Sequence, residues 1–242
     1  MIKFEDIKNN AQINTYIKKA DETLEAISFT EHSFAHATKV SSDAAYILET
    51  LGYDERSINL AKIAGYMHDI GNVINRNNHS QSGAILAFRL LDHMNMDPDD
   101  IADIISAIGN HDEGNGNPVN AIAAALIIAD KSDVRQSKVR EKVEYTDIHD
   151  RVNYSVKKRE LKINNDHTII KLKLEIDTKV SSVMDYFEIF LTRMLMCKSA
   201  AAKLNIKFKL IINEQTLIWE IYNFFTIHLL LLHHLSLQII YN

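Results

Sequence analysis

Residues 66–71 read Tyr66-Met67-His68-Asp69-Ile70-Gly71. The segment before them, from Ser57 to Met67, repeats apolar residues at steps of three and four, which predicts an amphipathic helix capped by Ser57. His68 and Asp69 therefore stand at the end of a helix, directly before a glycine. Adjacent side chains on a helix point about 100° apart, so the pair can face one metal ion only where the chain turns.

Helical patterns continue on both sides of this stretch. The segment Phe34–Leu51 carries one apolar stripe and is followed by Gly52, a typical C-cap. A further helix is expected over Gln81–Leu91, and Asp97-Pro98 is a helix start signal. Asn120 precedes the apolar helix Ala121–Ala129. We therefore predict an all-helical domain over residues 1–150.

The pattern changes after residue 150. Residues 161–163 and 168–177 are strand-like, residues 180–204 are helical, and residues 207–212 alternate again between apolar and polar. This predicts a small α+β unit over residues 151–218, in the order strand, strand, helix, strand, followed by an apolar tail at 219–242. The expected fold class is mainly α with this unit appended.

Composition limits the functions that are open to the chain. The net charge of −5 gives no general reason to bind a nucleic-acid polymer, but it leaves room for a small phosphorylated substrate. A single cysteine, Cys197, suits a reducing cytoplasm, and its helical context predicts a buried apolar side chain. The N-terminus lacks the apolar core of a signal peptide, and polar residues interrupt the C-terminal tail, so we expect no membrane span.

Several other helix ends and loops present a histidine or an aspartate. Asp130 ends the buried apolar helix, where a carboxylate is costly unless it is paired or bound to metal. The histidines concerned are His36, His79 and His111. Imidazole and carboxylate ligands without thiolate suit manganese, iron, cobalt, nickel, zinc or magnesium. We expect His32 to be exposed at a helix start, and His149 and His167 to be surface residues.

Three segments in this order resemble the HD superfamily of metal-dependent phosphohydrolases. They are His36-Ala37-Thr38-Lys39-Val40, His68-Asp69-Ile70-Gly71 and Ala129-Asp130-Lys131-Ser132-Asp133. The resemblance covers roughly residues 30–140. It implies an all-helical catalytic domain in which His36, His68, Asp69 and Asp130 coordinate a divalent metal ion.

Two subgroups of that superfamily use extra histidines for a second metal ion. They are the HD-GYP cyclic di-GMP phosphodiesterases and the symmetrical diadenosine tetraphosphate hydrolases, and His79 and His111 stand in suitable places in the order. One or two ions per site are therefore expected. The chain departs from the HD-GYP pattern at Asn72, Asn110-His111 and Gly116-Asn117-Pro118, so we expect hydrolysis of a phosphomonoester or nucleotide rather than of cyclic di-GMP.

The resulting functional hypothesis is hydrolysis of a small phosphoester. Asp69, Lys131 and Arg135 are the candidate catalytic residues, with Asp112 or Asp133 orienting a water or a ligand imidazole. The alternative is a catalytically inactive nucleotide-sensing module, which Asn72 favours. An open edge on a small sheet further predicts self-association as a homodimer.

Overall fold

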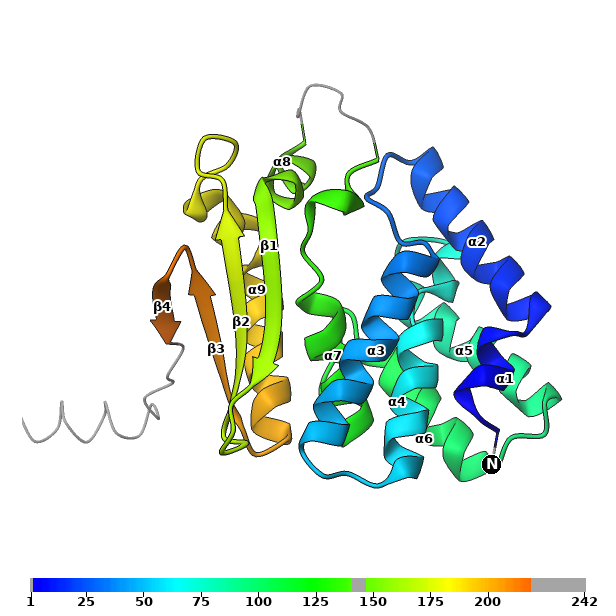
Figure 1. Cartoon of the computed structure of the whole chain (residues 1–242). Coiled ribbons are helices and arrows are strands. Elements are labelled where there is room, and N and C mark those ends of the chain that lie inside the picture. The colour runs from blue at the N-terminus through cyan, green and yellow to red at the C-terminus, as the bar shows by residue number, and fades with distance from the viewer. Residues whose placement is uncertain (1, 141–146, 219–242) are drawn as a thin grey trace, which may run out of the picture.

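The computed structural model describes residues 2–140 and 147–218, so the predicted tail at 219–242 lies outside the described residues. Its first part is helical (Figure 1). The helices and 3₁₀ turns are α1 (Phe4–Lys8), α2 (Ala11–Ala26), α3 (Phe34–Thr50), α4 (Glu55–Met67), η1 (Ile70–Val73), α5 (His79–His93), α6 (Pro98–Gly109), α7 (Ala121–Lys131), η2 (Gln136–Lys138) and α8 (Ile148–Ser155).

Helix α7 occupies the centre of the helical part. Every residue from Ile122 to Ala129 is at most 4% exposed, and the helix contacts α3, α4, α6 and α9. Such a helix is buried on all sides, as its apolar sequence predicts. The last turn of α7 places Asp130 at the edge of the core, beside the ends of the neighbouring helices.

Side-chain caps fix where the helices of the site begin. Asn120 accepts a hydrogen bond from the Ala123 amide, and Asp97 accepts one from the Asp99 amide with proline at the first helical position, as the sequence predicts. The cap predicted for α4 is wrong: Asp54, not Ser57, is the N-cap, and its carboxylate accepts from the Ser57 amide. Two residues with capping side chains lie three apart there, and the earlier one takes the role.

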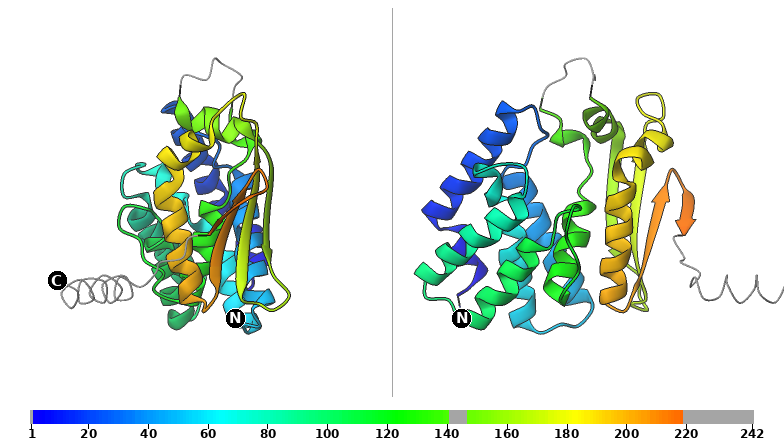
Figure 2. Two further views of the ribbon diagram at one scale, coloured as in Figure 1. Left: turned by 90° about the vertical axis from the view of Figure 1, so that its left-hand side faces the viewer. Right: turned by 180° about the vertical axis from the view of Figure 1, so that it is seen from behind.

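A four-stranded sheet and one long helix follow the helical part. The elements are β1 (Val156–Ile163), β2 (Ile169–Ile176), α9 (Val183–Lys203), β3 (Lys207–Ile212) and β4 (Gln215–Ile218). The strand order is β1-β2-β3-β4, with β2 and β3 parallel and the outer pairs antiparallel. Helix α9 makes the crossover between β2 and β3 and lies between the sheet and α7 (Figure 2). It thus joins the sheet to the helical core.

The fold class agrees with the sequence prediction, a helical domain followed by a small α+β unit. No separate range was predicted from the sequence for α1, α2, α8, the two 3₁₀ turns or the short strand β4. Strand β1 also begins at Val156, five residues before the predicted start, because its early residues are charged and hide the strand pattern. The domain boundaries proposed after residues 150 and 218 stay a prediction.

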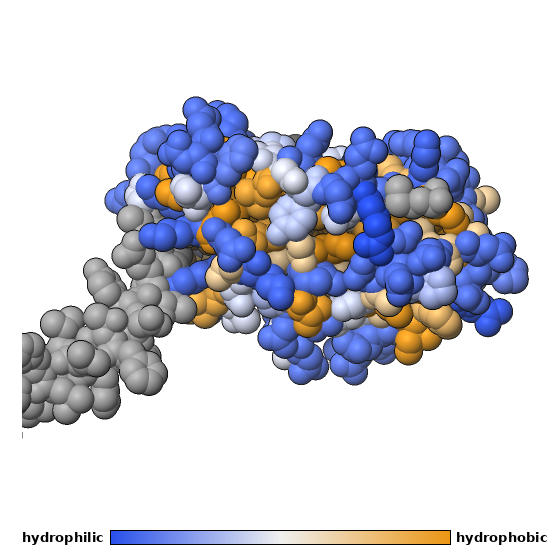
Figure 3. All heavy atoms as spheres, turned by 90° about the horizontal axis from the view of Figure 1, so that it is seen from below, coloured by the Kyte–Doolittle hydropathy of each residue, from blue (hydrophilic) through white to orange (hydrophobic). Residues whose placement is uncertain are grey.

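Apolar side chains also reach the surface. On the face in Figure 3, apolar residues lie in a band between hydrophilic margins. The exposed large apolar residues include Ile85 and Phe88 of α5 and Met184 and Leu195 of α9. Association as a homodimer, which the open edge of the small sheet suggested, stays a prediction. No helix within residues 2–140 and 147–218 has the length and apolar character that crossing a membrane requires.

Candidate metal centre

Helix ends and connections bring the predicted ligands together. His36 lies on α3, His68 and Asp69 lie between α4 and η1, and His79 opens α5. His111 lies two residues beyond the end of α6, and Asp130 lies in the last turn of α7. Residues 94 positions apart in the chain thus meet in one place, so the helix packing, and not a single loop, builds the centre.

Gly71 allows the turn that follows the His68-Asp69 pair. A Cβ atom built there would lie 1.9 Å from the His79 carbonyl oxygen and 2.5 Å from the Gly83 amide nitrogen. Only glycine therefore lets η1 pack directly against the start of α5. This close approach places Asp69 beside His79.

Five histidines share one hydrogen-bonding arrangement. In each of them Nδ1 lies within hydrogen-bond distance of an oxygen that can only accept, so Nδ1 carries a proton and Nε2 is the atom left to bind a second proton or a metal ion. The contacts are His32 to the Thr30 carbonyl at 2.7 Å, His36 to Asp133 Oδ2 at 2.7 Å, His68 to the Gly65 carbonyl at 2.8 Å, His79 to the Arg76 carbonyl at 3.1 Å and His111 to the Ile108 carbonyl at 2.6 Å.

The free Nε2 atoms converge in two pairs. Nε2 of His36 lies 3.3 Å from Nε2 of His68, and Nε2 of His79 lies 3.1 Å from Nε2 of His111. Two lone pairs at these distances repel each other unless a proton or a cation lies between them. This arrangement of donor atoms is what a nitrogen-ligated metal ion requires.

Asp69 stands between the two pairs of histidines. Its Oδ2 lies 3.1 Å from His68 Nε2 and 3.5 Å from His36 Nε2, while its Oδ1 lies 3.3 Å from His79 Nε2. Oδ2 is buried and accepts no hydrogen bond from the described residues. A buried carboxylate oxygen without a donor is costly, so this atom fits a metal ligand.

Asp130 completes the half of the centre around His36. Its Oδ1 lies 3.4 Å from His36 Nε2 and 3.6 Å from His68 Nε2, and its Oδ2 lies 2.8 Å from Lys131 Nζ. His36, His68 and Asp130 can together hold one ion, and so can His68, Asp69 and His111. The residues present therefore fit a divalent metal, with Asp69 able to bridge two ions.

The charges around the centre favour a cation inside it. Burial lowers the pKa of His68, but Asp69 and Asp130 outweigh burial and raise it to about 10. Burial raises the pKa values of Asp69 and Asp130, but the surrounding cationic and hydrogen-bonding groups hold both well below their usual range. Two ionised carboxylates thus face a cluster of imidazoles, and that field attracts positive charge.

A comparison with known protein families agrees with the resemblance noted in the sequence. The model of the HD domain matches residues 33–152, a span that runs from the start of α3 into α8 and holds all six predicted metal ligands. The chain is an HD-domain protein. The match ends within α8, before the sheet and α9.

One relative extends the similarity beyond the HD domain. The uncharacterized protein MJ1020 of Methanocaldococcus jannaschii is 22% identical over 210 residues, which cover 77% of this chain and 79% of that protein. An alignment of this length includes more than the HD domain. This similarity indicates no activity for the chain, because the name of the relative states none.

His32 is a correction to the sequence analysis. It was expected to be exposed at a helix start, but it is only partly exposed, and its ring lies 5.2 Å from the His36 ring. His32, His36 and Asp69 can together hold an ion. The spacing of four residues between the two histidines was the available signal, although His32 itself precedes Ser33, the N-cap of α3. His149 and His167 are exposed, as expected.

The two basic residues predicted to act on substrate lie in different places. Lys131 is in the centre, buried, with Nζ 2.8 Å from Asp130 Oδ2 and 3.3 Å from Glu113 Oε1. The Arg135 guanidinium instead contacts Asp133, Glu31 and Ser137. Arg135 thus approaches the centre only through Asp133, from behind the His36 ring.

One contact from the α+β unit to the HD domain was not predicted from the sequence. Nε of Arg193, in α9, lies 2.7 Å from Oε1 of Glu113, and Glu113 in turn pairs with Lys131. Burial raises the pKa of Glu113, but Lys131 and Arg193 outweigh it and lower the pKa to about 2. Nothing in the sequence around Arg193 marks this contact, because 80 residues separate the two partners.

Proposed function

We propose that the HD domain of this chain is a metal-dependent phosphohydrolase that acts on a small phosphorylated molecule, with nucleotides as the favoured class. The observation that carries the proposal is the convergence of imidazole Nε2 atoms on the two oxygens of Asp69. Asp69 and the ligand histidines form a preorganised anionic and imidazole-lined centre, which is suited to metal-assisted hydrolysis.

A divalent ion held there would lower the pKa of water and stabilise negative charge on a phosphoryl group. The chain's own residues supply the rest. Asp69 spans both halves of the centre, Lys131 holds Asp130 through the oxygen that faces away from the histidines, and Asp133 holds the proton on Nδ1 of His36. Each contact fixes a ligand atom before substrate arrives.

Arg76 adds a cation near the position where the HD-GYP pattern has lysine. The Asn72 amide donates to Asp69 Oδ1 at 3.0 Å, and Arg76 Nη1 lies 3.3 Å from both Asn72 Oδ1 and His79 Nε2. Arg76 is partly exposed at the rim of the centre. We assign it the role of binding a substrate phosphate, because a guanidinium can donate two parallel hydrogen bonds to phosphate.

For Arg135 we propose a positioning role rather than contact with substrate. Its hydrogen bonds to Asp133 at 3.1 and 3.3 Å fix the carboxylate that orients His36. The single cysteine is buried, and we keep a reducing cytoplasm as the proposed location on that composition.

Phosphate release from a panel of nucleotides, dinucleotides and simple phosphomonoesters, with manganese added, tests the proposal. Wild type is compared with Asp69→Asn, which preserves the shape of the side chain but removes its charge. Asp166→Asn, in the exposed loop between β1 and β2, is the matched control. Release by wild type and the control, but not by Asp69→Asn, supports the hydrolase.

The panel also separates the alternative function. Manganese bound by wild type together with no release from any compound would favour the nucleotide-sensing module. Release that persists in Asp69→Asn would contradict the assignment of the centre itself.

A further inference from the structure

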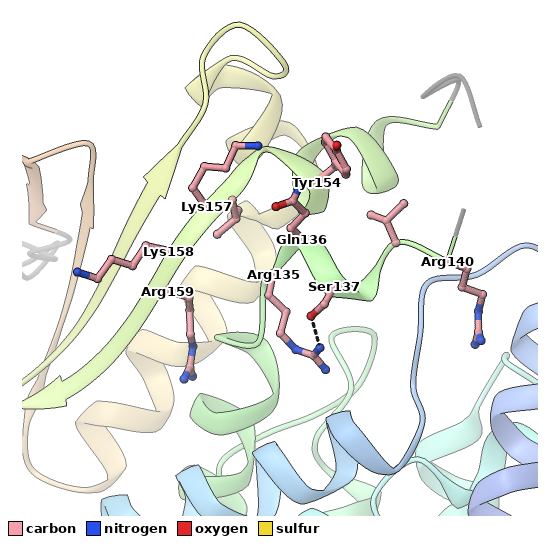
Figure 4. A pocket seen from close by; sticks show the side chains of 10 residues that line it. Arg135, Gln136, Ser137, Arg140, Tyr154, Lys157, Lys158 and Arg159 are labelled. Carbon is pink, nitrogen blue, oxygen red and sulfur yellow. Dashed lines mark hydrogen bonds between the residues drawn. The ribbon is translucent and has the colours of Figure 1, made fainter. Parts of the chain in front are cut away.

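A cavity outside the metal centre is lined by cations. It lies between η2 and the start of β1 and has a volume of about 620 Å³ (Figure 4). None of the six proposed metal ligands lines it. Its basic residues are Arg135, Arg140, Lys157, Lys158 and Arg159.

Within the part of the chain that the structure describes, the residues that line the cavity include no acid. Acidic partners approach the cations from outside it, and two of them are shared: Asp133 also contacts Lys138, and Asp43 also contacts Lys39. Among the described residues, Arg140 pairs with Asp21, Arg135 with Glu31 and Asp133, Arg159 with Asp43, and Lys157 with Asp177. None of these acids is a lining residue, so the charged groups that the described lining presents to the cavity are all cations.

These ion pairs also hold the guanidinium groups in place. Arg159 lies 2.7 Å from Asp43 and donates to the Ser132 carbonyl at 3.0 Å. Arg135 is held by Asp133 and Glu31. Guanidiniums fixed in this way lose little side-chain freedom when an anion binds, and their planar donors match phosphate oxygens.

The exposed Lys157 and the half-buried Tyr154 lie side by side in the lining of the cavity. Lys157 extends towards Tyr154, with its Nζ 5.1 Å from the ring centre (Figure 4). Oδ2 of Asp177 lies 3.9 Å from Nζ of Lys157, so this ion pair is loose. The ammonium can therefore turn to a ligand at little cost, and the tyrosine ring offers a face beside it.

We propose that this cavity binds a small polyphosphate, either free or as part of a nucleotide, at a site separate from the metal centre. Its volume lies within the range of roughly 300–1,000 Å³ that is usual for small-ligand sites. A ligand held by Arg135 lies next to Asp133, the residue that contacts His36. The binding does not depend on hydrolysis, so it can be tested apart from the proposed function.

Isothermal titration with inorganic triphosphate tests the proposal. The full chain carries Asp69→Asn and is freed of metal by dialysis against a chelator, so that metal-held phosphate is excluded. We expect one triphosphate per chain, with an affinity that falls as salt is added. Lys157→Glu should weaken binding at least about tenfold, because it reverses a charge on an exposed side chain without removing packing.

Lys162→Glu is the matched control, since it lies on the same strand and is exposed but is not a lining residue. It should leave binding within about twofold of the parent. Arg135→Gln is a second cavity variant, and circular dichroism verifies its fold. The proposal is overturned if both cavity variants bind as tightly as the parent, or if His68→Gln abolishes binding instead.

The same titration with adenosine triphosphate separates free polyphosphate from nucleotide. A nucleotide ligand should bind more tightly than triphosphate alone and lose that advantage in Tyr154→Ala. Equal affinities that are insensitive to Tyr154→Ala identify the polyphosphate part as the recognised group. No binding of either compound by the parent refutes the site.

Discussion

Oδ2 of Asp133 lies 2.7 Å from Nδ1 of His36, and both side chains are fully buried. Asp133 is three residues beyond Asp130, so the end of α7 supplies a ligand and, one turn later, the carboxylate that orients another ligand. This places the proton of His36 on Nδ1 and directs Nε2 to the metal centre.

Asp133→Asn should weaken manganese binding by roughly tenfold or more, because the amide accepts a weaker hydrogen bond from His36 and no longer supplies its charge. Titration of the metal-free protein with manganese measures the affinity. Asp166→Asn, exposed and distant from the centre in the sequence, should bind as wild type does. Equal affinities for Asp133→Asn and wild type would show that the contact does not orient a ligand.

His111→Gln should reduce the number of bound manganese ions from two to one. His111 pairs with His79 on the Oδ1 side of Asp69, while His36, His68 and Asp130 remain on the other side. Metal content after removal of free ions measures this, and His167→Gln is the exposed control. A single manganese ion in wild type would contradict the prediction that the centre holds two ions.

Gly71→Ala should destabilise the fold by about 3 kcal/mol or more, because its methyl group meets backbone atoms that cannot move separately. Gly109→Ala is the matched comparison. Its Cβ would lie 3.7 Å from the nearest heavy atom, and the change should be neutral or slightly stabilising. Urea unfolding of both variants decides the matter, and similar midpoints would refute the close packing of η1 on α5.

Arg193→Met and Glu113→Gln should show coupled effects on stability. The two side chains are 2.7 Å apart and mostly buried, so a double-mutant cycle should give a coupling on the order of 1 kcal/mol. The exposed Lys19 and Glu22 pair provides a control cycle, expected to give less than about 0.5 kcal/mol. Strict additivity at Arg193 and Glu113 would mean that α9 does not support the centre through this contact.

Cys197 should resist thiol reagents in the folded protein up to about pH 9. Burial raises the pKa of its thiol above the ordinary value of 9.0. At a pH where an exposed cysteine is already ionised, Cys197 therefore forms little of the reactive thiolate. Labelling by a disulfide reagent, followed in buffer and in urea, measures this. Fast labelling of the native chain at pH 8 would place Cys197 at an accessible position.

The sequence alone determined that the first part of the chain is helical, and it predicted which residues form the candidate centre. Helical periodicity and capping residues located the helices because these signals act between near neighbours. The order of His36, His68-Asp69 and Asp130 indicated the family because each stands at a helix end or on a buried face. The short strand β4 and helix α8 carried too few residues to show a period.

Only the tertiary structure decided how these residues meet. It brought His32 into contact with His36, set Arg135 behind Asp133, and joined Arg193 of α9 to Glu113. It also gathered Arg135, Lys157 and Arg159 around one cavity. Local patterns cannot specify such contacts, because they depend on how α9 and the sheet pack against α7 and on residues far apart in the chain.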